Sequence, residues 1–239
     1  MLTLYWVNGS IPSWRVMLAL HEKGLPFASE RLRVMTKQRQ TRTPEFLAIN
    51  PRGEAPALVL PDGAVVVESL AILTFLEHHA PSPALLPDDP AALAVVLSRM
   101  HAVEMLRKVY RPMEQLFRPL TSLKAHEIAA IRRVADALPA ELAIWEGYLA
   151  AHDFIASDAM SLADCSLYPA LAYQLRRGLS LDGFPRLRAY VDRIAARPAA
   201  QAAHPTGWDG GKPKDLFARA RQLPVLDLSL IHISEPTRQ

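Results

Sequence analysis

The chain has 239 residues, half of them apolar, which is enough for two small domains and a substantial buried core. A net charge of +3 at pH 7 does not indicate a nucleic-acid partner, and no apolar run approaches the roughly 18 residues that span a membrane. The single cysteine, Cys165, excludes an internal disulfide framework, a Cys-x-x-Cys redox pair and a multi-cysteine zinc site, and it favours a reducing, cytoplasmic location.

The first part of the chain alternates strand and helix signals. Residues 2–7 alternate apolar and polar side chains, so we expect a first strand and no signal peptide here. A helix over 14–23, which stops at Gly24, and a short strand over 28–34 follow. Two strands joined through a helix are expected to lie parallel, with a right-handed crossover.

A small helix, a hairpin and a longer helix complete the N-terminal pattern. A proline opens a short helix over 44–49, and strands over 57–60 and 64–67 flank a Pro-Asp-Gly turn signature. A helix over 69–79 comes next. This order predicts an α/β fold in which helices pack against an open mixed sheet.

Four prolines between residues 80 and 90 would interrupt any helix there. We therefore predict an interdomain linker at 81–90, between a first domain over 1–80 and a second, all-helical domain over 91–228. The final residues, 229–239, break the preceding pattern and resemble a translated vector or adapter tail, so we interpret them as non-native. The predicted helices of the second domain cover 91–118, with Pro112 as a kink, 124–151, 161–177 and 185–197.

Two serines precede the predicted first helix, in the stretch GSIPSWRVMLAL. Ser13 is placed to cap a helix that begins at Trp14, which would occupy its oxygen with backbone N–H groups. Ser10 lies earlier, at the exit of the strand, where a chemically useful hydroxyl can sit. From these residues alone, one serine could be catalytic or both could be helix caps.

Pro56, in the stretch NPRGEAPALVL, directly precedes a predicted strand. A proline has no N–H to donate to a central strand ladder. One solution is a cis Ala55–Pro56 bond, which would leave the N–H and C=O of Ala55 free to pair with an extended peptide ligand. An ordinary trans proline at the start of a strand is the alternative.

Glu68 and Ser69 stand where a strand gives way to a helix. Ser69 can cap the helix, and the free N–H groups at such an end accept a carboxylate. Glu68 could hold an ammonium group, so the pair suits the head group of an α-amino acid. The alternative is a helix cap beside a solvated glutamate.

Seven motifs in chain order resemble the cytosolic glutathione transferases, most closely the rho class, with N-terminal motifs like those of the phi and theta-like serine classes. The resemblance covers about residues 2 to 208. The motifs are GSIPSWRVMLAL, EFLAINPRGEAPAL, VVVESLAILTFLE, LLPDDPA, WEGYL, SLADCSLYPALAY and FPRLRAYVDRIAARP.

The resemblance implies a thioredoxin-like N-terminal domain, an all-helical C-terminal domain and a homodimer. It implies an enzyme that conjugates glutathione, its co-substrate, to hydrophobic electrophiles in detoxification. Glu68 and Ser69 would bind the γ-glutamyl head group, and Ala55, before a cis Pro56, would pair with the cysteinyl backbone.

The glycine carboxylate of glutathione would meet Arg42, with Gln40 near enough to help. Glu54 departs from the family pattern, in which this position is usually Gln or Lys. A carboxylate at this position would repel an anionic peptide unless it is paired or turned away.

The thiolate of glutathione is the nucleophile, and a free thiol of this kind has a pKa of about 8.5. Lowering that pKa by two units takes roughly 2.7 kcal/mol, which is the size of one charge-assisted hydrogen bond to the sulfur. Ser10 aligns with the catalytic serine of the phi-like pattern, so we favour Ser10 and keep Ser13 as a helper. Tyr5, within the first strand, is a weaker rival.

The second substrate is expected to bind in an apolar cleft between the two domains. Ile11 and Pro12 would form one wall, and Arg15 should pack across the domain junction or form an ion pair. The opposite wall would come from the first long helix, whose candidates are Arg107, Tyr110, Met113, Glu114 and Phe117.

Ser161 and Asp164 have the spacing of a capping box and should fix the start of a core helix. Cys165, inside that helix, is expected to be a buried, small apolar residue. The histidines show no metal-binding spacing, so we expect no metal site.

Two further functions remain in competition with the transferase. A non-catalytic ligand carrier or interaction module could use the same fold, and Glu54 favours it. A glutathione-dependent disulfide reductase would need a cysteine near residue 10, which the sequence lacks.

Overall fold

The computed structural model describes residues 1–208, 210 and 213–224, so the predicted tail 229–239 lies outside the described residues. The N-terminal elements are β1 (Leu2–Val7), α1 (Ile11–Glu22), β2 (Phe27–Leu32), α2 (Pro44–Ile49), β3 (Ala57–Val59), β4 (Val65–Val67) and α3 (Ser69–His79). The helices that follow are α4 (Pro90–Tyr110), α5 (Ala125–Tyr148), α6 (Leu162–Arg176), α7 (Pro185–Ala195), α8 (Pro198–Ala202) and α9 (Leu216–Arg221).

The four strands form one mixed sheet in the order β2-β1-β3-β4. β1 runs parallel to β2, with Leu2 opposite Phe27, and antiparallel to β3, which pairs with β4 as a hairpin. The parallel pair and the hairpin were both predicted and are confirmed. Gly63, at φ +88°, supplies the left-handed backbone that the hairpin turn requires.

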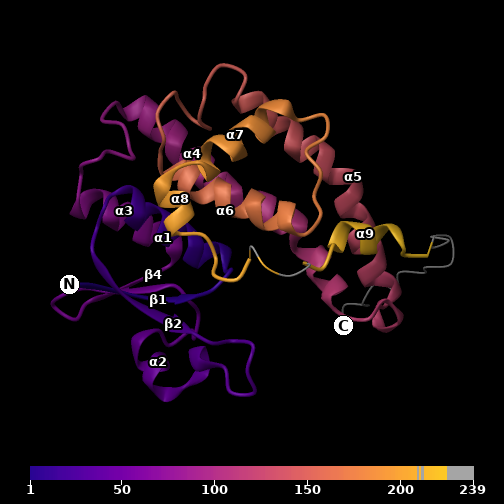
Figure 1. Ribbon diagram of the computed structural model, residues 1–239, viewed down its shortest axis with the longest axis horizontal. Coiled ribbons are helices and arrows are strands. Elements are labelled where there is room, and N and C mark those ends of the chain that lie inside the picture. The colour runs from indigo at the N-terminus through magenta and orange to yellow at the C-terminus, as the bar shows by residue number, and fades with distance from the viewer. Residues whose placement is uncertain (209, 211–212, 225–239) are drawn as a thin grey trace, which may run out of the picture.

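Helices cover both faces of the sheet, with α1 and α3 on one side and α2 on the other (Figure 1). Alternation along β1 explains this arrangement: Leu4 is fully buried in one cluster with Ile72 of α3, whereas the Tyr5 ring lies 5.9 Å from that of Phe46 in α2. The result is the expected thioredoxin-like domain, whose sheet carries the candidate site at one end.

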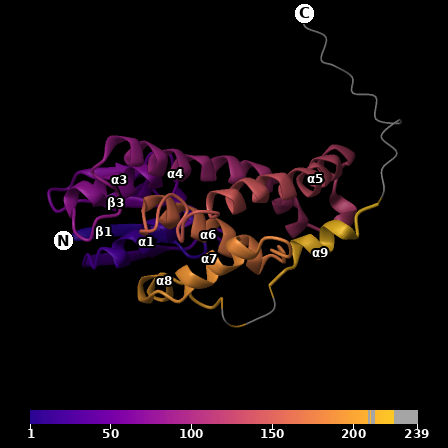
Figure 2. The same ribbon diagram turned by 90° about the horizontal axis from the view of Figure 1, so that it is seen from above.

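The helical half shares a core with this domain. Trp14 of α1, Met100 of α4 and Leu171 of α6 belong to one buried cluster. A second cluster includes Met113 and Leu216, and it lies at the α5 and α9 end of the molecule, away from the sheet (Figure 2). The all-helical fold of this half is confirmed.

The main differences from the sequence predictions are two helix ends and two short helices. The first helix begins at Ile11 rather than Trp14, because Pro12 is accommodated in its first turn. The helix predicted over 91–118 ends at Tyr110 and continues as a 3₁₀ helix, Arg111–Phe117, because Pro112 has no N–H to donate to an α-helical partner. The short helices α8 and α9 were not predicted.

Two ion pairs lie near the domain junction, one inside the first domain and one between the two domains. The Lys23 ammonium, fully buried at the end of α1, lies 2.6 Å from the Glu77 carboxylate of α3 and donates to the carbonyls of Ala80 and Pro83. Arg197, just before α8, makes two hydrogen bonds of 2.6 and 2.7 Å to Glu22. Within the described residues, no helix combines the length and apolarity that crossing a bilayer requires.

Candidate active site

The two candidate serines have different environments at the junction of β1 and α1. Ser10 occupies the N-cap position: its carbonyl accepts from the Trp14 N–H at 2.8 Å. Its hydroxyl has no hydrogen-bond partner in the described part of the chain. Ser13 is fully buried, and its oxygen accepts from the Val7 N–H at 3.1 Å. The prediction that Ser13 caps a helix starting at Trp14 was therefore wrong, and Ser10 is the serine with a free hydroxyl.

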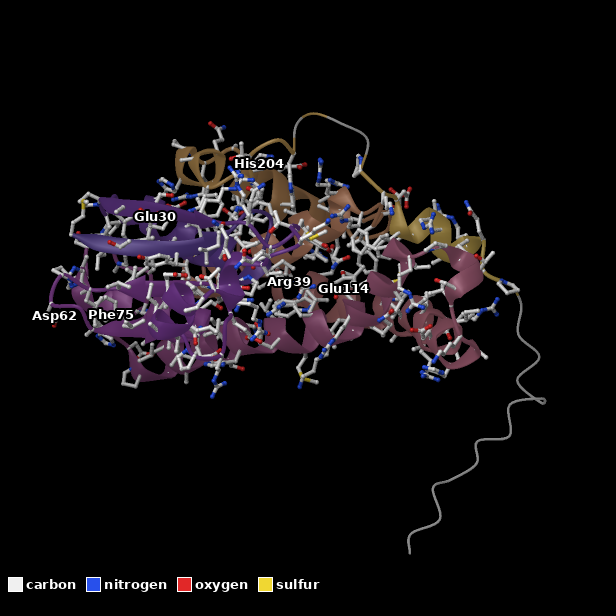
Figure 3. All side chains as sticks on the ribbon, turned by 90° about the horizontal axis from the view of Figure 1, so that it is seen from below. Glu30, Arg39, Asp62, Phe75, Glu114 and His204 are labelled. Carbon is white, nitrogen blue, oxygen red and sulfur yellow. The ribbon has the colours of Figure 1, made fainter. Side chains whose placement is uncertain are left out.

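A cavity of about 310 Å³ opens beside Ser10. Arg42 lines it, as predicted, but Gln40 does not, because the Gln40 side chain accepts from the Arg33 N–H at 2.5 Å. Arg39 lines the cavity instead and was missed, although Lys37, Arg39 and Arg42 lie close together in the sequence. Arg39 lies near the middle of the molecule in Figure 3. The lining residues are Val7, Ser10, Val34, Arg39, Thr41, Arg42, Gly53, Glu54 and Ala55.

A neighbouring cavity of about 490 Å³ shares Glu54 and Ala55 with the first. The Ala55–Pro56 bond in its wall is cis, as predicted. Glu68 and Ser69 also line this cavity at the start of α3. The remaining lining residues are Pro12, Arg15, Asn50, Leu70, Ala71, His101, Glu104 and Arg107.

The start of α3 differs from the predicted cap. Glu68, not Ser69, is the N-cap residue, and neither side chain caps the helix. Glu68 has φ +66°, a left-handed conformation that is uncommon outside glycine and concentrates at functional sites. Its carboxylate is largely exposed and lies 3.6 Å from Arg52, so it remains accessible to a cationic ligand group.

Glu54 lines both of these cavities. Its backbone carbonyl accepts from the Asn50 amide at 2.6 Å, which holds the loop before Pro56 in place. Its side chain is exposed and forms no ion pair within the described residues. The carboxylate is therefore neither neutralised by a partner nor removed from the two cavities.

A buried arginine joins α1 to α4. The Arg15 guanidinium is almost fully enclosed and donates to one carboxylate oxygen of Glu104 at 2.8 Å, while Arg107 donates to the other at 2.7 Å. Burial lowers the pKa of Arg15, and the adjacent Glu104 charge opposes that shift. The expected ion pair of Arg15 is confirmed, and it links the two domains beside the 490 Å³ cavity.

A third cavity, of about 410 Å³, lies between the start of α1 and the end of α4. It contains the predicted Ile11, Arg107, Tyr110 and Glu114. Charged side chains dominate its wall, in contrast to the apolar cleft that we expected between the domains. The lining residues are Ile11, Glu104, Arg107, Lys108, Tyr110, Arg111, Glu114 and Gln174.

Met113 and Phe117 do not line the third cavity. Met113 is buried in the second cluster, because the change from α-helix to 3₁₀ helix turns it toward α5 and α9. The Phe117 ring packs beneath the guanidinium of Arg177, 4.7 Å from its centroid. Both are packing residues of the helical half.

Two buried groups remain protonated in this fold. Burial raises the pKa of the Tyr110 hydroxyl, and Glu141 adds to the shift; this hydroxyl has no hydrogen-bond partner among the described residues. Burial also raises the pKa of the Cys165 thiol, which is fully enclosed as expected. The protein's own sulfur is thus neither accessible nor ionised, and a thiolate nucleophile has to come from a ligand.

The predicted cap of α6 is in place. The Asp164 carboxylate accepts from both the N–H and the hydroxyl of Ser161 at 2.8 Å, and from the Ile155 N–H at 2.9 Å. These bonds serve the core and lie outside the three cavities. Among the described residues, no group of three His, Cys, Asp or Glu side chains has a geometry that could hold a metal ion.

Comparison with known families identifies the class of protein. Residues 10–79 match the glutathione S-transferase N-terminal domain, and residues 101–198 match the glutathione S-transferase C-terminal domain. Glutathione S-transferase A of Pleuronectes platessa is 33% identical over 211 residues, which cover 87% of this chain and 92% of the relative. The chain belongs to the glutathione S-transferase family, and this membership supports glutathione transferase activity.

One further curated relative and two solved structures are also similar to this chain. A maleylacetoacetate isomerase of Pseudomonas aeruginosa is 31% identical, with 84% of this chain and 95% of the relative covered. A glutathione S-transferase from the Antarctic clam Laternula elliptica matches with a TM-score of 0.81 at 26% identity, covering 92% of this chain and 99% of that one. A sphingomonad glutathione S-transferase solved with glutathione matches with a TM-score of 0.70 at 30% identity, covering 84% and 96%.

Proposed function

We propose that this protein conjugates the glutathione thiolate to an electrophile, with Ser10 as the residue that stabilises the thiolate, in the manner of the rho and related serine classes. The observation that carries the proposal is the contrast between the serines. Ser10 lines a cavity, and its hydroxyl has no hydrogen-bond partner among the described residues, whereas the Ser13 oxygen is buried and already accepts a backbone hydrogen bond.

Glutathione would lie along the two cavities that share Ala55. Its γ-glutamyl ammonium would meet Glu68, and the N–H groups at the start of α3, beginning with Ser69, would receive the α-carboxylate. Arg42 and Arg39 would receive the glycine carboxylate, with Arg39 in the role predicted for Gln40. Ala55 would pair with the cysteinyl backbone.

Glu54 opposes the binding of glutathione electrostatically, because both carry negative charge. Glu54→Gln should therefore tighten the binding of glutathione.

In the reaction, the thiol of glutathione loses its proton to solvent and the Ser10 hydroxyl donates a hydrogen bond to the resulting sulfur anion. The sulfur then forms a bond to the electrophilic carbon, and a leaving group such as chloride departs with the bonding electron pair. The Ser10 contribution is an electrostatic one, since the hydroxyl stays protonated throughout.

Retention on immobilised glutathione and turnover of 1-chloro-2,4-dinitrobenzene test the proposal. Ser10→Ala should lower kcat by about tenfold or more, as the loss of one charge-assisted hydrogen bond implies, while retention persists. Ser13→Ala is the matched control and should retain most of the activity. Retention without turnover in the native protein would instead support the non-catalytic carrier.

A second candidate is the isomerisation of maleylacetoacetate, the reaction for which the Pseudomonas aeruginosa relative is named. The observation in its favour is the charged wall of the third cavity, which suits an acidic substrate. Turnover of maleylacetoacetate with glutathione unchanged at the end of the reaction would select this function over conjugation.

We also propose a cytoplasmic homodimer, as is typical of the family, with domains at 1–80 and 91–228 joined by the linker 81–90. Size-exclusion chromatography with light scattering tests the dimer, and limited proteolysis tests the linker.

A further inference from the structure

The third cavity contains cationic groups that the protein itself does not neutralise. Lys108 and Arg111 are exposed on its wall, and neither forms an ion pair with an acidic side chain in the described part of the chain. The one hydrogen bond of the Lys108 ammonium among the described residues goes to the Met105 sulfur, at 3.9 Å. Both side chains are therefore available to a ligand in the cavity.

One of the two acidic groups of the wall is already engaged. Both carboxylate oxygens of Glu104 accept hydrogen bonds, one from Arg15 and one from Arg107, so Glu104 does not offset Lys108 and Arg111. Glu114 is the remaining acid of the wall; it is exposed and forms no ion pair among the described residues. The unpaired charges of the cavity thus sum to a net positive value.

The position of this cavity relates it to the sulfur site. Ile11 lines it and directly follows Ser10, the proposed thiolate-stabilising residue. Arg107 lines both this cavity and the one that would hold the γ-glutamyl group. A molecule in the third cavity would therefore approach the nucleophile from the α4 side of the groove.

The chemistry of the wall selects a class of second substrate. Its apolar side chains are Ile11 and the Tyr110 ring, which is almost fully buried, so an uncharged aromatic molecule would bury little apolar surface against it. A carboxylate would gain charge-assisted hydrogen bonds from ammonium and guanidinium donors, which are about twice as strong as neutral ones.

We propose that the second substrate is an electrophile that carries a carboxylate, bound by Lys108 and Arg111 in the third cavity. This inference rests on the proposed transferase function and names the substrate class of the same site. Glu114 limits the negative charge that the cavity accepts, because its unpaired carboxylate repels a second anionic group.

A matched pair of substrates tests the assignment: 4-chloro-3-nitrobenzoate and the uncharged 4-chloro-3-nitrobenzamide. In both, the glutathione sulfur bonds to the ring carbon that carries chlorine, and chloride leaves with the electron pair. The two molecules differ in one ring substituent and therefore in intrinsic reactivity. For each variant we take the ratio of KM for the benzoate to KM for the benzamide and compare it with the same ratio in the native protein, which cancels that difference.

The double variant Lys108→Gln/Arg111→Gln should raise KM for the benzoate by about tenfold or more, while KM for the benzamide changes by less than about twofold. Glu114→Gln should act in the opposite direction and lower KM for the benzoate. Arg133→Gln is the matched control: Arg133 is exposed on α5 and lines none of the three cavities. An unchanged KM ratio in the double variant would overturn the proposal.

Two measurements distinguish a failure of the proposed transferase function from a failure of the proposed carboxylate site. Turnover of the benzamide reports the transferase, whatever the charge preference. If neither molecule is turned over, calorimetric binding of 4-chloro-3-nitrobenzoate still decides the question. Binding that is lost in the double variant and kept in Arg133→Gln supports the anion site, and binding that is absent or insensitive to both refutes it.

Discussion

Replacing Glu77 with glutamine should destabilise the protein severely, because it leaves a buried cation without its counter-charge. The Lys23 side chain has 0% relative exposure and that of Glu77 has 9%. The other Glu77 oxygen accepts from the N–H groups of Leu85 and Leu86, at 3.0 and 3.2 Å, so the pair also fixes the segment that leads into α4.

The expected loss follows from this environment. Removing one partner of a buried ion pair costs about 3–5 kcal/mol, against a total stability of about 5–15 kcal/mol for a typical protein. Glutamine keeps an acceptor for Leu85 and Leu86, so the loss reports the charge rather than those two bonds. The double variant Lys23→Met/Glu77→Gln should regain part of the stability, since the unpaired cation is gone.

Urea unfolding followed by circular dichroism, at one fixed protein concentration, measures these differences. The control is Asp153→Asn, which breaks the exposed pair with Arg193 and should change the free energy of unfolding by less than about 1 kcal/mol. A loss below 1 kcal/mol for Glu77→Gln, or a double variant less stable than the single one, would refute the reasoning.

Two further substitutions test local geometry. Gly9→Ala should destabilise the protein and reduce kcat/KM, because Gly9 has φ +72° and an added Cβ would lie 2.7 Å from the Trp208 ring. Gly24→Ala is the control: Gly24 has φ +61° but nothing within 4 Å of an added Cβ, so this variant measures the backbone cost alone, about 1–2 kcal/mol. Equal losses of stability in the two variants would exclude a contribution from the Trp208 contact. Ser161→Ala should cost about 1–3 kcal/mol in urea unfolding without altering the glutathione KM, since it removes a buried donor to Asp164 far from the cavities; a changed KM would contradict that separation.

Elements that depend on short-range chemistry could be predicted from the sequence. The alternation in β1, the Pro-Asp-Gly turn and the spacing of Ser161 and Asp164 each gave the right element, because the short-range chemistry and the tertiary fold agree at these positions. The cis bond before Pro56 was one of two alternatives that the residues left open, and only the family resemblance selected it.

Features set by long-range packing were not predictable. Periodicity could not show that Pro112 ends α4 and turns Met113 into the second cluster. Pro12 hid the true start of α1, which places Ser10 rather than Ser13 at the N-cap position. The charged wall of the third cavity arises where the end of α4 faces Ile11 of another domain, and spacing along one helix does not reveal such a juxtaposition.

The central claim is that the Ser10 hydroxyl stabilises the glutathione thiolate, and ultraviolet titration of the bound thiol measures this most directly. From a free value of about 8.5, we predict that the thiol pKa falls to about 6.5 on the native protein, the equivalent of roughly 2.7 kcal/mol. In Ser10→Ala it should return most of the way to the free value, and in Ser13→Ala it should stay close to the native one. A thiol pKa that Ser10→Ala leaves unchanged would contradict the account.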